Sequence, residues 1–385
     1  MKKTIIILTH VIFDNSPYCI FVHEHAKALK QQGYNVIVFA ILNWIPFAGF
    51  LKKERKKHYK EKNGIKIIDG VTVIYKKRLS FSNLFIDSKI NLNGISYYLT
   101  IKNMIRKIAK ENDILFIDAH MFKVEGYVAS LLHKKFGFKA TVTCHGNSLI
   151  KTTEYKNSKY IVSQIMDNIN YAVCVSNSLE NRLKKYGYNN TKVIYNGINF
   201  YDIEKNICTR ENTIITVATL IKRKNVDLVI EAFQKVHEKF EDKKLVIVGQ
   251  GIEETKLKQE VKRLGIEGSV SFLGQRSNEE VHKLMQKSKI FILPSINEGF
   301  GIVYAEAMKN GCITIGTKNE GIDGFIKDGI NGFLVKPELD DIISKLYYIL
   351  ENEREIDKII ECGIKDAENL SWDNNAKEYI KLFEN

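Results

Sequence analysis

One segment of the sequence, residues 293–308, combines glycines and carboxylates in a spacing that suits phosphate chemistry. An apolar run ends at Pro294, a polar loop with Gly299 and Gly301 follows, and a helical pattern begins near residue 301. Glycine lets a ligand approach the backbone closely, and the free N–H groups and dipole at the start of a helix favour a phosphate. The segment therefore predicts a phosphate-binding loop between a strand and a helix.

Glu306 is the lone carboxylate within the apolar run 302–308. A buried carboxylate costs on the order of several kcal/mol unless hydrogen bonds or a cation compensate for it. We therefore expect Glu306 to be buried and to meet a ligand, for which the paired hydroxyl groups of a ribose are suitable. The competing interpretation is a surface glutamate on a half-exposed helix, and the preceding glycine loop makes this the weaker of the two.

The elements that must position this loop follow from alternating strand and helix patterns, which predict parallel sheets with helices on both faces. Strands are expected at residues 4–9, 35–40, 71–75, 114–118, 141–145, 171–176 and 192–195, and helices at 20–32, 95–110 and 124–136. The alternation restarts after residues 196–198, with strands at 213–218, 245–249, 270–274, 290–294 and 313–316 and helices at 226–239, 253–264, 278–286, 302–309 and 339–350. A last helix is expected at 374–383.

This order predicts two doubly wound, Rossmann-like α/β domains, residues 1–196 and 197–370, followed by a helical tail, residues 371–385. Doubly wound sheets bind ligands at the carboxyl ends of their strands. With two such sheets, we expect the active site in the cleft between the domains.

Composition agrees with a globular protein of two ordinary domains. The chain has 385 residues, of which 44% are hydrophobic and 27% charged. The apolar run 5–8 is too short for a signal peptide. The six cysteines are scattered without a metal-like spacing, as in proteins of a reducing cytosol. We therefore expect a cytoplasmic protein.

The formal net charge of +13 points to an acidic partner. No nucleic-acid-binding pattern accompanies this charge, so nucleic acid is not expected. The apolar, aromatic residues 41–51 precede the basic run 52–57, and the apolar part is too short to span a bilayer but suits an interfacial anchor. We therefore expect an anionic membrane surface to bind residues from Trp44 to Lys57, on the inner face of the cell membrane. The alternative is that residues 44–51 pack in the domain core beside a solvated basic loop.

Glu298 and Glu306 are separated by seven residues within the pattern P-S-x2-E-G-F-G-x4-E-A-M. This pattern closely resembles the E-x7-E signature of the retaining glycosyltransferase family 4. Other segments resemble the family's motifs and follow its order, namely residues 196–198, 248–251, 272–274 and 328–335. The resemblance implies the GT-B fold, with two domains facing each other across a cleft and a C-terminal helix that crosses back to the first domain.

The resemblance also implies an activity, the transfer of a sugar from a nucleotide-diphosphate sugar to a saccharide or lipid-linked saccharide. Residues 1–196 would bind the acceptor and 197–370 the donor. Residues 21–29 resemble the first helix of a subgroup that builds surface polysaccharides such as capsules. The catalytic residues implied by the resemblance are His145, Glu298 and Lys224. The implied donor-binding residues are Lys224, Arg223, Gly274, Arg276, Glu298, Gly299, Phe300, Gly301 and Glu306.

These residues have distinct roles in the family. Glu306 would hold the ribose, Glu298 would contact the donor sugar, and the backbone of residues 299–301 would bind the diphosphate. Lys224, with Arg223 as the alternative, would neutralise the leaving diphosphate, because a fixed cation stabilises the charge that develops as the bond breaks. No Asp-x-Asp triplet stands in a suitable loop, so no metal and no cofactor are expected.

In the first domain, His145 within T-C-H-G-N resembles the family's strand-end His-Gly, which implies a position beside the reacting sugar. His120, at the end of the preceding strand, is a weaker candidate. His23 and His25 are two positions apart on a helix and face different sides, so they do not predict a metal site.

Three positions depart from the family's pattern. Residues 15–19 lack the glycine-rich loop that follows the first strand, Thr219 replaces a common arginine, and Ser148 replaces a common aspartate. Two other functions therefore stay open, a nucleotide-sugar epimerase of similar architecture and an inactive partner subunit. An assay without acceptor separates the three functions, since an epimerase changes the sugar, a transferase slowly releases nucleotide, and an inactive subunit does neither.

Overall fold

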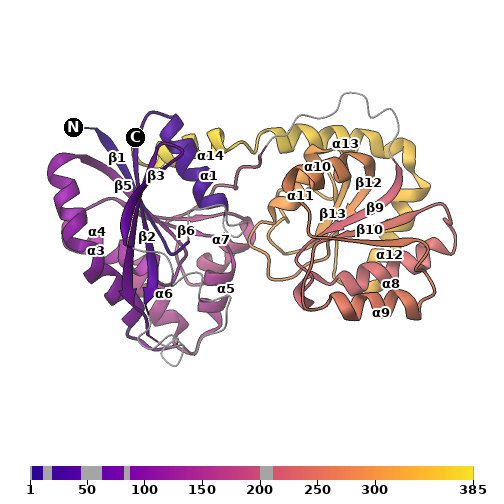
Figure 1. The fold of residues 1–385 in the computed structure, drawn as a ribbon, viewed down its shortest axis with the longest axis horizontal. Helices are drawn as coiled ribbons and strands as arrows, with labels where there is room; N and C mark the ends of the chain where they lie inside the picture. The colour runs from indigo at the N-terminus through magenta and orange to yellow at the C-terminus, as the bar shows by residue number, and fades with distance from the viewer. Residues whose placement is uncertain (1, 12–19, 45–62, 82–86, 200–210, 385) are drawn as a thin grey trace. The chain divides into compact units, whose positions relative to one another are not determined.

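The computed structural model describes residues 2–11, 20–44, 63–81, 87–199 and 211–384. The chain forms two compact units (Figure 1). The first comprises Met1–Gly197 with Trp372–Asn385, and the second comprises Ile198–Ser371. Each unit is a doubly wound α/β sheet with helices on both faces, which confirms the expected fold class.

The sheet of the first unit has the strand order β3-β4-β2-β1-β5-β6-β7-β8, and all neighbours are parallel except β3 and β4. The strands are β1 (Lys3–Thr9), β2 (Asn35–Trp44), β3 (Gly64–Ile68), β4 (Val71–Leu79), β5 (Asp113–His120), β6 (Ala140–Cys144), β7 (Tyr171–Cys174) and β8 (Thr191–Val193). The helices are α1 (Ile20–Gln31), α3 (Leu92–Glu111), α4 (Glu125–Phe136), α5 (Asn147–Glu154), α6 (Ser158–Met166) and α7 (Asn177–Lys184). Gly33, at φ +92°, ends α1 in the left-handed conformation expected there.

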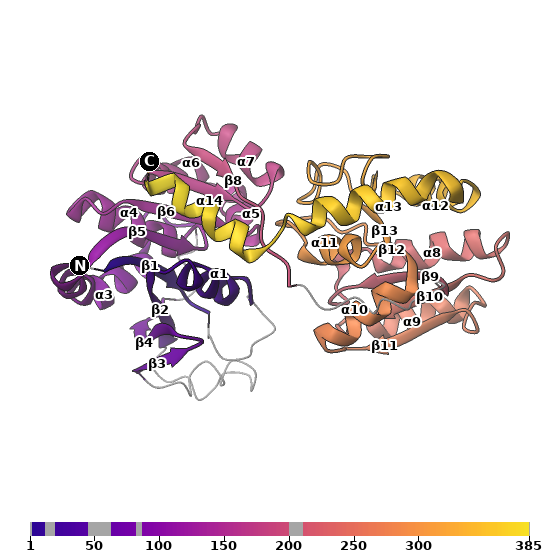
Figure 2. The ribbon, with the colours of Figure 1, turned by 90° about the horizontal axis from the view of Figure 1, so that it is seen from above.

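The last helix, α14 (Trp372–Glu384), packs against α1 in the first unit (Figure 2). Trp372, Tyr379 and Phe383 are buried in the core that β1 and β2 form with α1. Trp372 lies so close to Gly197 that a Cβ added to the glycine would be 2.5 Å from the indole ring. The C-terminal helix therefore crosses back to the first unit, as expected.

The sheet of the second unit has the order β11-β10-β9-β12-β13-β14, and all its strands are parallel. The strands are β9 (Glu211–Val217), β10 (Lys244–Val248), β11 (Val270–Gly274), β12 (Ser288–Ile292), β13 (Ile313–Thr317) and β14 (Phe333–Val335). The helices are α8 (Val226–His237), α9 (Glu254–Arg263), α10 (Asn278–Lys287), α11 (Ile302–Lys309), α12 (Leu339–Glu351) and α13 (Glu353–Glu368). The central strands are apolar on both faces, as the strands of a covered parallel sheet are.

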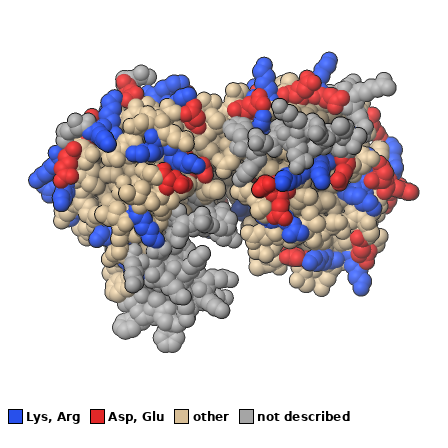
Figure 3. Space-filling view, turned by 45° about the horizontal axis from the view of Figure 1, so that its top comes forward, with Lys and Arg blue, Asp and Glu red and all other residues tan. Residues whose placement is uncertain are grey.

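Several elements differ from the sequence prediction. The short strands β3 and β14 and the helices α5, α6, α7 and α13 were not predicted, and β2 and β4 are longer than expected. β4 continues through the basic residues 76–78 because they pair with Ile41, Leu42 and Asn43 of β2, and Arg78 is buried at the end of the strand. These basic residues therefore belong to a strand and do not form a separate patch. On the face drawn in Figure 3, basic and acidic side chains are interspersed over both units.

Candidate active site

The carboxyl ends of β9 and β12 form the switch point of the second sheet, since the chain leaves these adjacent central strands toward opposite edges. Doubly wound sheets bind their ligands at this point. The 3₁₀ turn Lys222–Lys224 follows β9, and Glu298 follows β12. The sheet order thus brings Lys224 into contact with Glu298, although they are 74 positions apart.

Two glycines shape the segment that carries the turn. A Cβ at Gly249 would lie 1.8 Å from the carbonyl oxygen of Ala218, and one at Gly251 would lie 2.1 Å from that of Leu220. The Leu220 amide also donates a hydrogen bond of 3.0 Å to the Gln250 carbonyl. The glycines of the predicted motif at residues 248–251 therefore allow two backbone segments to touch, and this contact holds the turn in place.

Glu298 accepts hydrogen bonds from two cations of the turn. Lys224 Nζ lies 2.9 Å from both carboxylate oxygens, and Arg223 Nη1 donates to Oε1. The side chains of Lys224 and Glu298 are only 11% and 10% exposed. Burial alone would raise the pKa of Glu298, but the charges of Lys224 and Arg223 lower it, so the carboxylate is ionised. Burial lowers the pKa of Lys224, against the effect of Glu298.

The loop after β12 is fixed by its own contacts. The Glu298 amide donates to Glu320 Oε2 at 3.1 Å, and a Cβ at Gly321 would lie 2.3 Å from the Gly299 carbonyl oxygen. Phe300 is buried, with its ring centroid 5.7 Å from that of Phe325. The loop therefore has a defined shape in which Glu298 faces the cations.

Gly301 makes the transition from this loop into α11. Its φ of +82° is in the left-handed region, and a Cβ would lie 2.5 Å from the ring of Tyr304. Both features require glycine at this position. Tyr304 donates a hydrogen bond to the Leu293 carbonyl at 2.6 Å, which ties the start of the helix to the end of β12.

The expectation that Glu306 is buried was wrong. Its side chain is 21% exposed and lies 3.8 Å from Nε2 of His282. The reason is that α11 has one partly exposed face, to which Ile302, Glu306 and Lys309 belong. The apolar neighbours of Glu306 in the sequence lie on the other faces, so the competing interpretation of a half-exposed helix describes its burial better.

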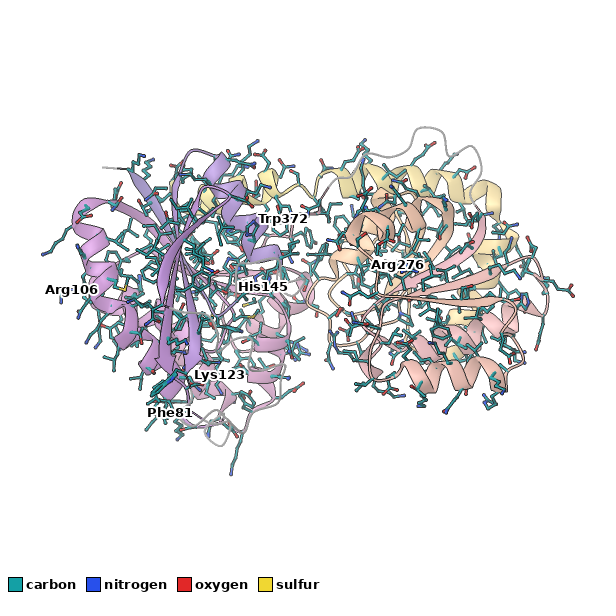
Figure 4. All side chains as sticks on the ribbon, in the orientation of Figure 1. Phe81, Arg106, Lys123, His145, Arg276 and Trp372 are labelled. Atoms are coloured by element: carbon teal, nitrogen blue, oxygen red, sulfur yellow. The ribbon has the colours of Figure 1, made fainter. Side chains whose placement is uncertain are left out.

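Gly274 and Arg276 lie at the same end of the sheet but farther from its centre. Gly274 ends β11, an edge strand two positions from β9, and has a φ of +67°. Arg276 is exposed in the loop that follows (Figure 4). Within the described part of the chain, no contact joins either residue to Glu298. Their role in donor binding therefore stays a prediction.

In the first unit, His145 follows β6 and is linked to a chain of buried polar side chains (Figure 4). Its Nε2 lies 2.8 Å from Nδ1 of His120, so one proton lies between the two rings. Burial, and then the neighbouring His120, lower the pKa of His145 well below that of a free imidazole. His145 Nδ1 is buried and has no hydrogen-bond partner among the residues that the structure describes.

Asp118 anchors this chain from the buried strand β5. Its Oδ1 accepts a hydrogen bond of 2.8 Å from Thr143, and its Oδ2 lies 2.9 Å from Nε2 of His120 and 3.3 Å from Nε2 of His25. Burial would raise the pKa of Asp118, but the charges and hydrogen bonds of His120 and His25 lower it below its usual range. The carboxylate is therefore ionised and orients both imidazoles.

The orientation of His25 follows from Asn375 on the C-terminal helix. The amide nitrogen of Asn375 donates to the Tyr195 carbonyl at 2.8 Å, so its Oδ1 faces His25 Nδ1 at 2.6 Å. His25 therefore donates through Nδ1, and its Nε2 lies 3.3 Å from Asp118 Oδ2. The sequence prediction missed Asp118 and His25, because this contact joins three segments that only the fold brings together.

His25, Asp118 and His120 also have the atom types and spacing of a metal site among the described residues. Asp118 Oδ2 lies 2.9 and 3.3 Å from the two Nε2 atoms, which are ion-pair distances, but none of these three atoms has a hydrogen-bond partner of good geometry among the described residues. His23 points elsewhere, to Asp69 at 2.7 Å, which agrees with the argument that the pair at residues 23 and 25 faces two sides of the helix. The absence of a metal cofactor stays a prediction.

Comparison with known proteins gives the family. The model of Glycosyltransferase Family 4 matches residues 20–200, and that of Glycosyl transferases group 1 matches residues 198–366. An uncharacterized glycosyltransferase, MJ1178 of Methanocaldococcus jannaschii, is 27% identical over 76% of this chain and 81% of its own. The N-acetyl-alpha-D-glucosaminyl L-malate synthase of Bacillus anthracis is 29% identical over 62% of this chain and 65% of its own.

Solved structures agree in fold. Sucrose-phosphate synthase from Thermosynechococcus elongatus has a TM-score of 0.76 and 17% identity, covering 99% of this chain and 98% of its own. Anabaena Alr3699/HepE, solved in complex with UDP, has a TM-score of 0.72 and 17% identity over 98% of each chain. Both halves of the sequence, the two doubly wound units and the named relatives thus lead to one assignment: the chain is a glycosyltransferase of the GT-B fold and belongs to glycosyltransferase family 4.

Proposed function

We propose that the chain transfers a sugar from a nucleotide-diphosphate sugar to a saccharide or lipid-linked saccharide, in the synthesis of a cell-surface polysaccharide. The observation that carries this proposal is the contact of Arg223 and Lys224 with Glu298 at the switch point of the second sheet. A diphosphate leaving group gains negative charge as the glycosidic bond breaks. Two fixed cations beside a glycine loop and a helix N-terminus suit that charge.

Each residue has a role in this mechanism. Glu298 holds the two cations in place in the free protein and contacts the donor sugar when substrate is bound. Lys224 and Arg223 then interact with the diphosphate, as Mg²⁺ does in metal-dependent enzymes. The backbone of residues 299–301 binds the phosphates, and Glu306 binds the ribose, for which a half-exposed carboxylate is accessible.

His145 acts on the sugar side of the reaction. Its depressed pKa keeps the ring neutral near pH 7, and its Nδ1, which is buried and has no partner among the described residues, is the atom that we assign to a hydroxyl group of the sugar. His120 and Asp118 position the ring through the contacts of 2.8 and 2.9 Å described above. The neutral ring therefore needs no proton transfer with solvent to form this hydrogen bond.

A thermal-shift screen against UDP, GDP and ADP tests the donor. A nucleotide that binds only the folded state raises the melting temperature by mass action. The solved complex of Anabaena HepE contains UDP, which makes UDP the first nucleotide to examine. If none of the three nucleotides shifts the melting temperature, the proposed donor class is wrong.

Glu306→Gln is expected to weaken binding of that nucleotide. A neutral amide accepts the ribose hydroxyl bonds less strongly than a carboxylate, and loss of a charge-assisted hydrogen bond corresponds to about a tenfold to hundredfold change in Kd. Isothermal titration calorimetry measures the change. Glu279→Gln, at an exposed glutamate on α10, is the matched control and should bind as the wild type does. Equal affinity in Glu306→Gln would remove Glu306 from the ribose site.

The alternatives from the sequence predict different products. An epimerase would convert the donor sugar without an acceptor, and an inactive partner would leave the donor unchanged. Of the two relatives, one is named a glycosyltransferase and the other an N-acetyl-alpha-D-glucosaminyl L-malate synthase. Both names favour transfer. Chromatography of the donor after incubation without acceptor therefore discriminates among the three.

We expect the transfer to retain the anomeric configuration of the donor. This expectation rests on the resemblance of the segment with Glu298 and Glu306 to the signature of retaining enzymes. NMR of the product formed from an α-linked donor checks it through the anomeric proton coupling. An α linkage is expected, and a β linkage would contradict retention.

Binding to an anionic membrane is also part of the proposal. Ile41 and Leu42 are buried in β2, whereas Trp44 is 47% exposed at the end of this strand. Residues 45–62, which hold most of the predicted anchor, lie outside the described residues. None of the described helices is long and apolar enough to cross a bilayer. Only the part of the apolar segment beyond Leu42 is therefore available for an interfacial role.

Liposome co-sedimentation is expected to show binding that needs anionic lipid and weakens with salt. Each Lys or Arg near such a surface contributes about 1 kcal/mol. Neutralising the five basic residues of the run should therefore abolish most of the binding; they are Lys52, Lys53, Arg55, Lys56 and Lys57. Equal sedimentation with and without anionic lipid would contradict the electrostatic attraction.

A further inference from the structure

The first unit has a cavity of about 420 Å³ at the carboxyl end of its sheet, separate from the residues of the histidine chain. It is lined by residues that follow β1, β4 and β5 and by the first turns of α3 and α5. Lys123 and Phe81, both in its wall, lie near each other in Figure 4. The switch point of this sheet is between β1 and β5, so the cavity is at the position where doubly wound sheets bind ligands.

The wall of this cavity is positively charged. Arg78, Lys123 and Lys151 line it, and Glu125 is the one acidic residue among the described residues of its wall. The Glu125 carboxylate is 2% exposed and lies 2.7 Å from His10 Nδ1, and its charge raises the pKa of His10. The one negative charge is therefore already paired, which leaves three cations facing the cavity.

Lys123 is the cation of this wall whose ammonium group has no hydrogen-bond partner among the described residues. Its Nζ is also inaccessible to solvent. The nearest favourable contact is the ring of Tyr155, 4.3 Å from Nζ to the centroid. Burial lowers the pKa of Lys123 to about 8, despite the charge of Asp87. Burying an ammonium group without a hydrogen-bond acceptor is unfavourable, so the site suits a partner that none of the described residues supplies.

The neighbouring groups hold Lys123 in place. Its backbone amide donates to Ser148 Oγ at 3.2 Å, and its carbonyl accepts from Asn91 Nδ2 at 2.7 Å. Arg78 is 6% exposed and donates through Nη1 to Asn93 Oδ1 at 2.7 Å, while its Nε has no partner within the described ranges. Arg78 of β4 and Lys123 of the loop after β5 thus both line the cavity, and each has a buried N–H group without a partner among the described residues.

We propose that this cavity binds the anionic group of the acceptor, a phosphate or a carboxylate, through Lys123 and Arg78, with Lys151 at its rim. This inference rests on the proposed function, since it assigns the acceptor of the transfer. An oxyanion supplies the missing acceptors for the Lys123 ammonium group and the Arg78 guanidinium group. The volume accommodates a group of this kind together with part of the molecule that carries it.

Binding of inorganic phosphate, glycerol 3-phosphate and succinate by isothermal titration calorimetry tests the proposal. The wild type should bind at least one of these anions, and Lys123→Met, which keeps the length of the side chain, should bind it about tenfold to a hundredfold more weakly. Lys123→Arg should retain most of the affinity. Lys159→Met, at an exposed lysine of the same unit, is the matched control and should bind as the wild type does. Equal affinity in wild type and Lys123→Met, or no anion binding by the wild type, would overturn the proposal.

Two further measurements are needed. One shows whether the anion belongs to a lipid, and the other distinguishes failure of this proposal from failure of the proposed donor. Vesicles containing phosphatidic acid, compared with phosphatidylcholine alone, show whether a lipid phosphate occupies the cavity, and their binding should also fall in Lys123→Met. The UDP-induced melting shift should be the same in every variant, because the nucleotide binds the other unit. Loss of that shift in the wild type would contradict the proposed donor and leave the anion result standing.

If Lys123→Met does not fold, Lys151→Met is the second variant, because Lys151 is an exposed residue at the rim of the cavity. It should weaken phosphate binding several-fold, and unchanged affinity there would count against the proposal.

Discussion

Lys224→Ala is expected to lower the rate of transfer on the order of 10²–10³, the usual effect of removing one preorganised group that stabilises developing charge. Lys224 is almost fully buried and bonds both oxygens of Glu298, so its ammonium group is fixed before substrate binds. A fixed cation needs no reorganisation as the diphosphate leaves. Initial rates of nucleotide release at saturating donor measure the effect.

Lys222→Ala is the matched control, because Lys222 stands in the same turn but is 71% exposed and pairs with Asp227. Its rate should equal that of the wild type. Lys224→Ala also leaves Glu298 with Arg223 alone, and removing one partner of a buried pair destabilises a protein by about 3–5 kcal/mol. Thermal melts therefore have to accompany the rates, and Lys224→Ala/Glu298→Gln should recover part of the lost stability without recovering the rate. Wild-type activity in Lys224→Ala would remove Lys224 from the mechanism.

The sequence predicted the parts of this site that local patterns encode. The apolar run before Pro294, the glycines after it and the helix that begins at Ile302 are all within one segment, so their order follows from residue types alone. The turn with Lys224 was found through the family's motif order. What the sequence could not predict is that Arg223 and Lys224 both bond Glu298, because this depends on β9 and β12 being neighbours in the sheet.

In the first unit, even less of the site could be predicted, because more of its contacts depend on which strands are neighbours. His145 and His120 each follow a predicted strand, so their nearness follows from the pairing of β5 with β6. Asp118 was not predicted, because an aspartate within an apolar strand has no local pattern that reveals its partners. The burial of Glu306 was wrong for a related reason, since apolar neighbours in sequence lie on other faces of a helix. The sheet order decides the contacts of Asp118, and the position on the helix decides the exposure of Glu306.

Asp118→Asn is expected to destabilise the first unit by about 3–5 kcal/mol, the effect of breaking a buried charge pair by removing one partner. Asp118 is fully buried, and the amide that replaces it would leave His25 and His120 without the carboxylate that both face. Urea unfolding near pH 7 measures the difference. Asp113→Asn, at the exposed start of the same strand, is the matched control and should unfold as the wild type does.

The pH dependence of this difference has a definite sign. The folded-state pKa of Asp118 is lowered, so its contribution is complete above the unfolded value of about 4 and is lost as the pH falls through the folded pKa. The wild type should therefore lose stability more steeply than Asp118→Asn below pH 4, and the gap between the two should narrow with acid. A gap that stays constant from pH 7 to pH 3 would show that the carboxylate charge is not what stabilises the chain.

His145→Ala distinguishes this anchoring role from catalysis. His145 is at the end of the chain of imidazoles, and its Nδ1 has no partner among the described residues, so its removal breaks the contact with His120 and the ring contact with Phe21 but no charge pair. The stability should fall less than in Asp118→Asn, because no charge pair is broken, whereas the rate should fall on the order of 10²–10³ if the ring contacts the sugar in the transition state. A large loss of stability with a normal rate in the folded fraction would make His145 part of the anchor, and the sugar contact would then have to come from another residue of the first unit.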